Sequence, residues 1–393
     1  MTNQLMVDAK MPKVFNWSLG LQHEIFKETT LELRYLGTRA LFLPVQIQSN
    51  SQTAFERGAR ALPTYFSSSA IPATVAADAP TLAQFLAARG RPYSAQGFPN
   101  AITSMQPAGT SAYHGGAVDL NRRFARGLLF RANYTWAKAM DNSTNDLFTS
   151  VVNPRRPQNP NNLRDEWSRS TLDIRHKAAM MWTYEIPKLN LDSRILRSVL
   201  HGWQWNGTYL FQSGQPMTLQ SGVDSNGNSD SAGDRVILNP NGVDRTGTAV
   251  RFVCRSSSGA TSVAASATAC GGSASVVGYV AANPNARYVQ AQAGAVANVG
   301  RNTADAGRFN LWNMSVLKRF NLTEGKSLQF RFELFNAFNV GQYALGFADV
   351  APVQISTNAT SPSYANVTAA NFLNERQFDR QGRYFQLGLK FSF

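Results

Sequence analysis

The chain of 393 residues has little of several features that mark common protein classes. It contains only two cysteines, which excludes a disulfide-dense scaffold and a zinc cluster. Charged residues make up 16% and hydrophobic residues 43%, which excludes a highly charged disordered chain. No apolar run reaches about 18 residues, so the sequence does not predict a transmembrane helix.

Aromatic side chains, by contrast, are abundant at 11% and recur with a period of two. Because successive side chains of a strand point to opposite faces, this period predicts strands with one apolar face. The segments with this pattern are 15–25, 30–36, 114–124, 128–136, 176–186, 203–212, 312–316, 328–334 and 383–393. We therefore predict nine strands of about ten residues, the length that a tilted strand needs to cross a bilayer.

Two features favour a membrane barrel over a soluble antiparallel β-protein, which would also alternate. Six of the seven tryptophans lie on the predicted strands, many near a strand end, as in the aromatic girdles of outer-membrane barrels. The opposite faces are polar, which suits a water-filled lumen better than a dry core. The charged side chains predicted to face this lumen are Glu32, Arg34, Arg131, Arg331 and Glu333.

Short and long connections alternate between the predicted strands. The long ones cover about 39–113, 139–175, 213–307 and 339–382. Outer-membrane barrels have this asymmetry, with short periplasmic turns and long extracellular loops. We therefore predict an all-β fold, an antiparallel transmembrane β-barrel segment whose long loops lie outside the cell and whose C-terminus lies in the periplasm.

The two cysteines, Cys254 and Cys270, lie 16 positions apart in the 213–307 connection, around a stretch of nearly low-complexity sequence. Since the outside of the cell is oxidising, we expect them to form a disulfide. The alternative is a pair of unpaired thiols in a mobile loop.

Residues that could carry chemistry are few. The four histidines are isolated on different strands or turns and no catalytic group can be assembled, so we predict no enzymatic activity and no cofactor. One oxygen-rich run could hold calcium, although Ser229 and Arg235 stand where an EF-hand needs glycine and glutamate. A solvated loop is the favoured alternative. The run consists of Asp224, Asn226, Asn228, Asp230 and Asp234.

The 38 basic and 24 acidic residues give a formal charge of +14. The basic residues are scattered rather than clustered, so we predict no nucleic-acid partner. A basic outer-membrane protein would meet anionic lipopolysaccharide, and arginines in a lumen would favour anionic solutes. Scattered, solvated charge is the alternative.

Several segments together resemble the C-terminal barrel region of Oar-like TonB-dependent outer-membrane receptors. They are 31–38, 113–136, 164–176, 202–216, 310–339 and the terminal strand, and their order and spacing cover nearly the whole chain. The resemblance implies a barrel of 22 strands preceded by a plug and, usually, a carboxypeptidase-regulatory-like domain. Residues 1–13 lack the apolar core of a signal peptide, and no plug or TonB box precedes the first strand. We therefore expect 1–393 to be the C-terminal portion of a receptor barrel.

The resemblance also implies import or export of a substrate with energy passed through TonB. We expect no gated or energised transport by this portion alone, and we expect substrate contact at the 39–113 and 213–307 loops. The resemblance further implies that the barrel-assembly machinery reads the terminal strand by strand addition. The residues expected to carry this signal are Phe385, Leu387, Leu389, Phe391 and Phe393. A surface adhesion or structural protein and a passive pore are the rival hypotheses.

Overall fold

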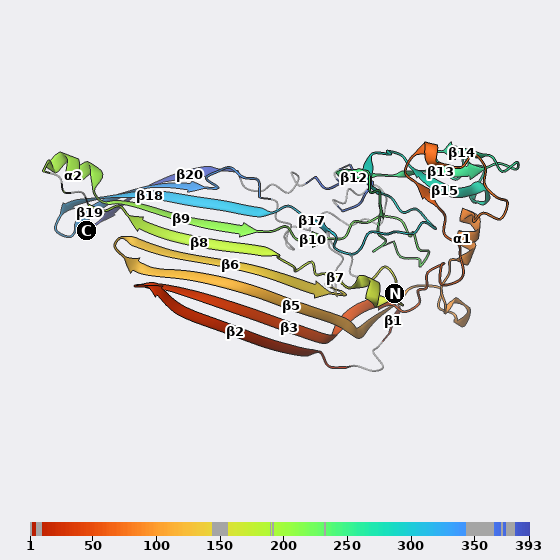
Figure 1. Cartoon of the computed structure of the whole chain (residues 1–393), viewed down its shortest axis with the longest axis horizontal. Coiled ribbons are helices and arrows are strands. Elements are labelled where there is room, and N and C mark those ends of the chain that lie inside the picture. The colour runs from red at the N-terminus through yellow and green to blue at the C-terminus, as the bar shows by residue number, and fades with distance from the viewer. Residues whose placement is uncertain are drawn as a thin grey trace.

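The computed structural model describes residues 2–4, 10–143, 156–188, 190, 192–231, 233–342, 365–370, 372–374 and 382–393. Its main element is one antiparallel sheet whose nine long strands follow each other in chain order, as predicted (Figure 1). They are β2 (Lys13–Phe26), β3 (Thr29–Gln48), β5 (Ile102–Ala125), β6 (Leu128–Asp141), β8 (His176–Glu185), β9 (Trp203–Gln212), β18 (Phe309–Thr323), β19 (Lys326–Phe335) and β20 (Tyr384–Ser392). Two short strands join the sheet: β1 (Thr2–Gln4) pairs with β5, and β7 (Ser168–Arg169) pairs with β6.

The sheet is open among the described residues, with β2 at one edge and β20 at the other. Each of these edge strands has a neighbouring strand on one side only. The outer backbone groups of β2 and β20 therefore have no strand partner in the described part of the chain. A sheet of this kind can extend by further strands at either edge.

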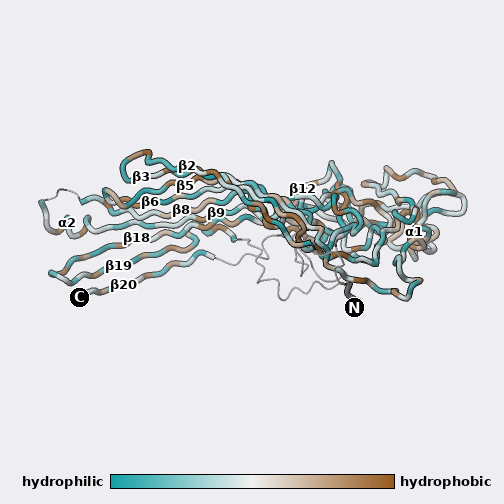
Figure 2. The backbone as a smooth tube through the Cα atoms, turned by 90° about the horizontal axis from the view of Figure 1, so that it is seen from below, coloured by the Kyte–Doolittle hydropathy of each residue, from teal (hydrophilic) through white to brown (hydrophobic). Residues whose placement is uncertain are grey.

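The register of the strands gives the sheet two faces of different polarity. Directly opposed residues of an antiparallel pair lie on the same face. Leu33 is opposed by Val118, which is opposed in turn by Tyr134, whereas Glu32 is opposed by Asp119. We call the first side the apolar face and the second the polar face. Hydrophobic and hydrophilic residues accordingly alternate along the strands (Figure 2).

β3 and β5 are much longer than the sequence pattern predicts, with 20 and 24 residues. Their pairing continues from Thr29 opposite Arg122 to Gln48 opposite Thr103. The added part of β5 is rich in small and polar residues, so the alternation of apolar side chains ends there although the backbone ladder continues. The 39–113 loop therefore begins about ten residues later than predicted.

The long connections pack together beyond one end of the sheet, and we call their described parts the loop domain (Figure 1). One small sheet joins β4 (Thr64–Tyr65), β15 (Val276–Ala281), β13 (Val250–Arg255) and β14 (Thr261–Ala264). A second joins β11 (Ile237–Leu238), β16 (Ala286–Val289) and β12 (Val243–Thr248), and a third pairs β10 (Pro216–Met217) with β17 (Ala304–Asp305). Four single 3-10 turns accompany them: η1 (Ser68–Ala70), η2 (Ser94–Gln96), η3 (Leu163–Glu166) and η4 (Ser273–Ser275). Most of the 339–382 connection and residues 144–155 lie outside the described residues.

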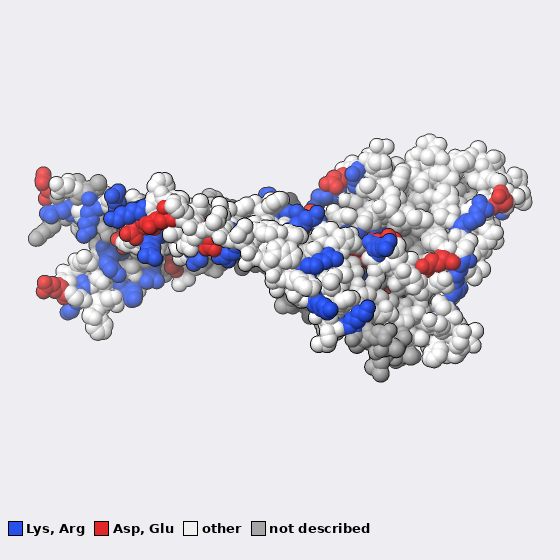
Figure 3. All heavy atoms as spheres, turned by 60° about the horizontal axis from the view of Figure 1, so that its bottom comes forward, with Lys and Arg blue, Asp and Glu red and all other residues white. Residues whose placement is uncertain are grey.

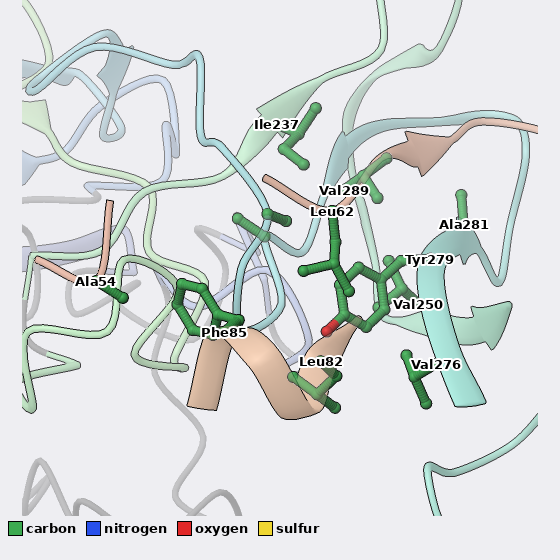
Figure 4. Close-up of a cluster of buried hydrophobic side chains, with 12 residues drawn as sticks. Ala54, Leu62, Leu82, Phe85, Ile237, Val250, Val276, Tyr279, Ala281 and Val289 are labelled. Atoms are coloured by element: carbon green, nitrogen blue, oxygen red, sulfur yellow. The ribbon is translucent and has the colours of Figure 1, made fainter. Parts of the chain in front are cut away.

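Helix α1 (Leu82–Ala88) supplies one wall of the loop-domain core. Thr81 begins it with a capping box, in which its hydroxyl accepts from the Gln84 N–H at 3.3 Å. Leu82 and Phe85 belong to the same buried cluster as Tyr279 of β15, and the Phe85 ring lies on the side of Ala54 (Figure 4). All three are buried, so the core combines residues from the 39–113 and 213–307 connections.

A second helix, α2 (Arg194–Leu200), lies at the opposite end of the sheet, within the connection predicted as a turn between β8 and β9. No helix in the described part of the chain is both long and apolar enough to span a membrane.

Candidate functional site

The polar face of the sheet contains a hollow that is lined by residues of the strands from β2 to β18. The hollow has a volume of about 740 Å³. Three of the five charges predicted to face a lumen line it, namely Glu32, Arg34 and Arg131. Glu333 and Arg331 lie farther along on β19, where Glu333 is opposed by Ser315 on the polar face. The polar side chains that complete the lining are Gln22, Thr30, Asp119, Asn121, Asn133, Thr208 and Asn313.

The hollow contains charges of both signs. Arg34 Nε donates to Glu32 Oε1 at 2.9 Å, and Asp119 stands opposite Glu32 on the neighbouring strand. Arg131 lies one rung away, opposite Asn121. Two acidic and two basic side chains thus share the hollow, so it has no excess of positive charge to favour anionic solutes.

The apolar face carries aromatic clusters. Trp312 stacks on Tyr209 with ring centroids 4.1 Å apart, and Trp182 meets Trp205 edge to face at 5.1 Å. Glycines make room for these rings: a Cβ on Gly207, which is opposed to Trp182, would lie 2.0 Å from the Trp182 ring. Large apolar side chains on this face are exposed, which suits a lipid environment.

Two histidines on the apolar face pair with tyrosines in the same way. Tyr35 Oη lies 2.8 Å from His114 Nδ1, and Tyr134 Oη lies 2.8 Å from His176 Nδ1. His176 is the first residue of β8, and His114, near the middle of the longer strand β5, is opposed by Lys138 close to the loop-domain end of β6. Both histidines therefore lie at the level where the shorter strands reach the loop domain, as expected of interfacial aromatic residues. No group of three or more His, Cys, Asp or Glu side chains is placed to hold a metal among the described residues.

A buried ion-pair network joins the sheet to the loop domain, and we call it the rim network. Its members are Asp141 at the end of β6, Glu166, Arg235 and Arg301, and all four are buried. Arg301 pairs with Asp141 and donates through Nε to the Glu166 carbonyl at 2.8 Å. Arg235 pairs with the Glu166 carboxylate. Sequence analysis missed this network because its members are far apart in the chain and follow no pattern.

The oxygen-rich run folds into a turn that uses its own acceptors. The Asp224 carboxylate pairs with Arg89 and accepts from the Asn228 and Ser229 N–H groups at 3.0 Å each. Asp230 pairs with Arg156. The solvated-loop alternative is wrong for much of the run, since Asn226, Asn228 and Asp234 are buried. Its oxygens serve hydrogen bonds and ion pairs within the protein.

Asp234 is the most deeply enclosed carboxylate of that run. It accepts from the N–H and the hydroxyl of Ser225, both at 3.2 Å. Burial raises its pKa well above the ordinary range, and the nearby Asp224 carboxylate adds to the effect. The loop domain therefore holds a proton on this group more tightly than the unfolded chain does.

The loop domain contains a pocket of about 590 Å³ between the 39–113, 139–175 and 213–307 connections. Its walls combine amides and carboxylates with one aromatic ring and a run of small residues. They include Phe55, Glu56, Gln158, Asn159, Asp165, Glu166, Asn226 and Arg235. Glu56 is held by Thr53, Asn159 and Asn161, whose hydrogen bonds lower its pKa against the opposing effect of burial.

Cys254 and Cys270 form a disulfide that fastens β13 to the segment before β15. The low-complexity stretch between them is ordered, with β14 paired to β13. The terminal strand β20 pairs with β19 from Tyr384 opposite Phe335 to Ser392 opposite Ser327. Phe385, Leu387, Leu389, Phe391 and Phe393 are all exposed.

Known proteins match the architecture. Residues 2–382 match the family described as "Outer membrane beta barrel domain". A search of curated proteins finds no match. Among solved structures, the outer membrane transporter YddB from Escherichia coli is 11% identical, with a TM-score of 0.39, over 100% of this chain and 34% of that one.

The siderophore receptor PirA from Acinetobacter baumannii is also 11% identical, with a TM-score of 0.36, over 98% of this chain and 32% of that one. The ferripyoverdine receptor of the Pseudomonas aeruginosa outer membrane is 10% identical, with a TM-score of 0.36, over 97% and 27%. The chain thus spans about a third of the length of these proteins. Given the family match over nearly all its residues, the chain belongs to the outer membrane beta barrel domain family and resides in the outer membrane.

Proposed function

We propose that residues 1–393 form the C-terminal portion of a TonB-dependent receptor barrel of the Oar-like type. The observation that carries the proposal is the open nine-stranded sheet, apolar on one face and hollowed on the other, with a packed loop domain at one end. Such a sheet supplies part of a barrel wall, its lumen lining and its external surface. The complete receptor would move a substrate across the outer membrane, and gating and coupling to TonB would come from its other parts.

The loop domain would face the outside of the cell and the short turns the periplasm. Outer-membrane lipid would contact the apolar face, and lipopolysaccharide would meet the girdle around His114 and His176. The substrate would bind at the loop-domain pocket. Its amides and carboxylates suit a polar, hydrogen-bonding solute better than an apolar one. We propose no enzymatic role, no cofactor and no nucleic-acid partner.

The terminal strand would be the part that the barrel-assembly machinery reads. Its outer backbone edge has no strand partner among the described residues, and its apolar side chains alternate, so both requirements of strand addition are met. Deleting Phe393 should lower the amount of protein inserted in outer membranes. Unchanged insertion would contradict the assembly proposal and leave the receptor proposal standing.

An antibody against residues 377–393, used on native outer membranes, tests the receptor proposal. A band far above 43.1 kDa is expected, because a complete receptor also contains a plug and further strands. A heat-modifiable band at 43.1 kDa would refute it.

The second candidate function is that of a surface adhesion protein. It would then be the favoured function, because the disulfide-fastened loop domain offers a stable outer surface. Liposome conductance would separate that candidate from a passive pore.

A further inference from the structure

Helix α2 lies at the end of the sheet opposite the loop domain, between β8 and β9 (Figure 1). It has seven residues and begins at Ser193, whose hydroxyl accepts from the Leu196 N–H at 3.4 Å. A connection in a barrel's short-turn end needs only a few residues. The 16 residues from 187 to 202 are therefore more than the turn requires, and the extra length forms a helix.

The helix has one apolar side that the described protein leaves uncovered. Ile195, Leu196, Val199 and Leu200 are 76%, 50%, 54% and 42% exposed. At 3.6 residues per turn these four side chains fall within an arc of about 140°. Arg197 lies outside that arc and is exposed to solvent. The helix is thus amphipathic, and its apolar side is exposed in the described protein.

Two side chains from the apolar face of the sheet hold the end of the helix. Lys318 Nζ donates to the Ser198 and Val199 carbonyls at 2.7 and 3.0 Å and also to the His201 carbonyl. Trp203 Nε1 donates to the Val199 carbonyl at 2.7 Å. A cation at this position also complements the partial negative charge of the helix C-terminus.

Lys318 and Trp203 are directly opposed across β18 and β9, on the same face as Trp205. They therefore fix α2 on the outward, apolar side of the sheet and not beneath the hollow. The uncovered side of the helix continues the apolar face beyond its short-turn end. Because the apolar face of an outer membrane barrel meets lipid, α2 lies where the acyl chains give way to headgroups.

We propose that α2 is an interfacial anchor that binds the phospholipid surface at the short-turn end of the barrel. Its apolar side enters the boundary between headgroups and acyl chains, and Trp203 lies beside it at the same depth. Lysine and arginine side chains gather at this end of the molecule, with some acidic side chains among them, and the basic ones suit anionic headgroups (Figure 3). The inference goes beyond the proposed receptor function, since it needs only the membrane location of the sheet.

Depth-dependent quenching tests the proposal on the full protein as isolated from outer membranes. The native cysteines are bonded to each other, so Val199→Cys supplies one free thiol for a polarity-sensitive fluorophore. The labelled protein is placed in bilayers of phosphatidylethanolamine and phosphatidylglycerol that carry a quencher near the carbonyl level. Ser198→Cys is the matched control, because it is the adjacent residue and lies outside the apolar arc.

We expect a blue-shifted emission and several-fold stronger quenching at position 199 than at position 198. Equal quenching at the two positions would overturn the proposal, as would emission typical of water at both. The fluorophore at position 199 could instead be shielded from water in native membranes and yet not be quenched by the quencher in the lipid bilayer. That result would assign the apolar side of α2 to a protein partner and would also overturn the proposal. Heat-modifiable migration in gels confirms that each labelled variant is folded. Transport is not measured, so failure here is separate from failure of the receptor proposal.

Discussion

The rim network makes a quantitative prediction for Glu166→Gln. Glu166 is buried, and its carboxylate forms an ion pair with Arg235. Glutamine keeps the size of the side chain and can still accept from the Gln158 N–H, which lies 3.0 Å from Oε1. The charge opposite Arg235 is lost, and Arg301 Nε loses a longer contact of 3.8 Å with the same carboxylate but keeps its pair with Asp141.

Breaking a buried ion pair costs about 3–5 kcal/mol, because the remaining charge stays in a poorly solvated place. We expect about 3 kcal/mol for Glu166→Gln, the lower end of this range, since Arg301 keeps its pair with Asp141 and the hydrogen bond from Gln158 is kept. Every 1.4 kcal/mol is tenfold, so opening of the loop domain should become about a hundredfold more frequent.

Hydrogen exchange of the protein in outer-membrane vesicles measures this opening. Faster exchange is expected in the loop domain, with the central strands β6 and β8 unchanged. Asp165→Asn is the matched control, because the neighbouring carboxylate is exposed. Equal exchange in the two variants would refute the reasoning. The double variant Glu166→Met with Arg235→Met removes both charges and should recover part of the loss.

Three further changes have expected outcomes. Gly207→Ala should lower thermal stability by about 1–3 kcal/mol, because its Cβ would overlap the Trp182 ring; loss of heat-modifiable migration at a lower temperature measures this. Replacing Cys254 and Cys270 by alanine should destabilise the loop domain by about 3 kcal/mol, the entropy of closing a loop of this length, as seen by limited proteolysis. Loop-domain stability should fall as pH rises from about 4, since the folded state raises the Asp234 pKa, and Asp234→Asn should remove that slope.

Each of these outcomes has its own control. Gly116→Ala tests the glycine effect, because no heavy atom lies within 4 Å of its Cβ position; an equal loss in both variants would contradict the aromatic overlap. Reduction of the wild-type protein should reproduce the double cysteine variant. A pH slope that survives in Asp234→Asn would place the proton on another group.

The strands were predictable because each contains its own signal. Period-two alternation fixes which residues share a face, so Leu33 and Glu32 could be assigned to opposite sides before their neighbours were known. The loop domain was not predictable in the same way. Its core joins Leu62 to Tyr279, and no local period marks residues that meet across such a distance in the chain.

The candidate sites show the same division. Sequence alternation placed Glu32, Arg34, Arg131 and Asp119 on the polar faces of their strands, but it could not give the register between strands. The register places Asp119 opposite Glu32, which removes the excess of positive charge from the hollow. The oxygen-rich run was recognisable by composition, whereas its arginine partners came from distant segments. Helix α2 was missed because seven residues are too few for a helical period to stand out.

The shared core of the loop domain limits how this surface can be altered. External loops of barrels are often regarded as independent appendages that can be exchanged one at a time. Here Thr64 and Tyr65 form the edge of a sheet whose other strands come from the 213–307 connection, and Phe85 packs against the same unit. A chimera that receives only one of these connections would inherit half of a hydrophobic core. Variation of this surface, in evolution or in the laboratory, should therefore proceed by coordinated change of whole sets of loops.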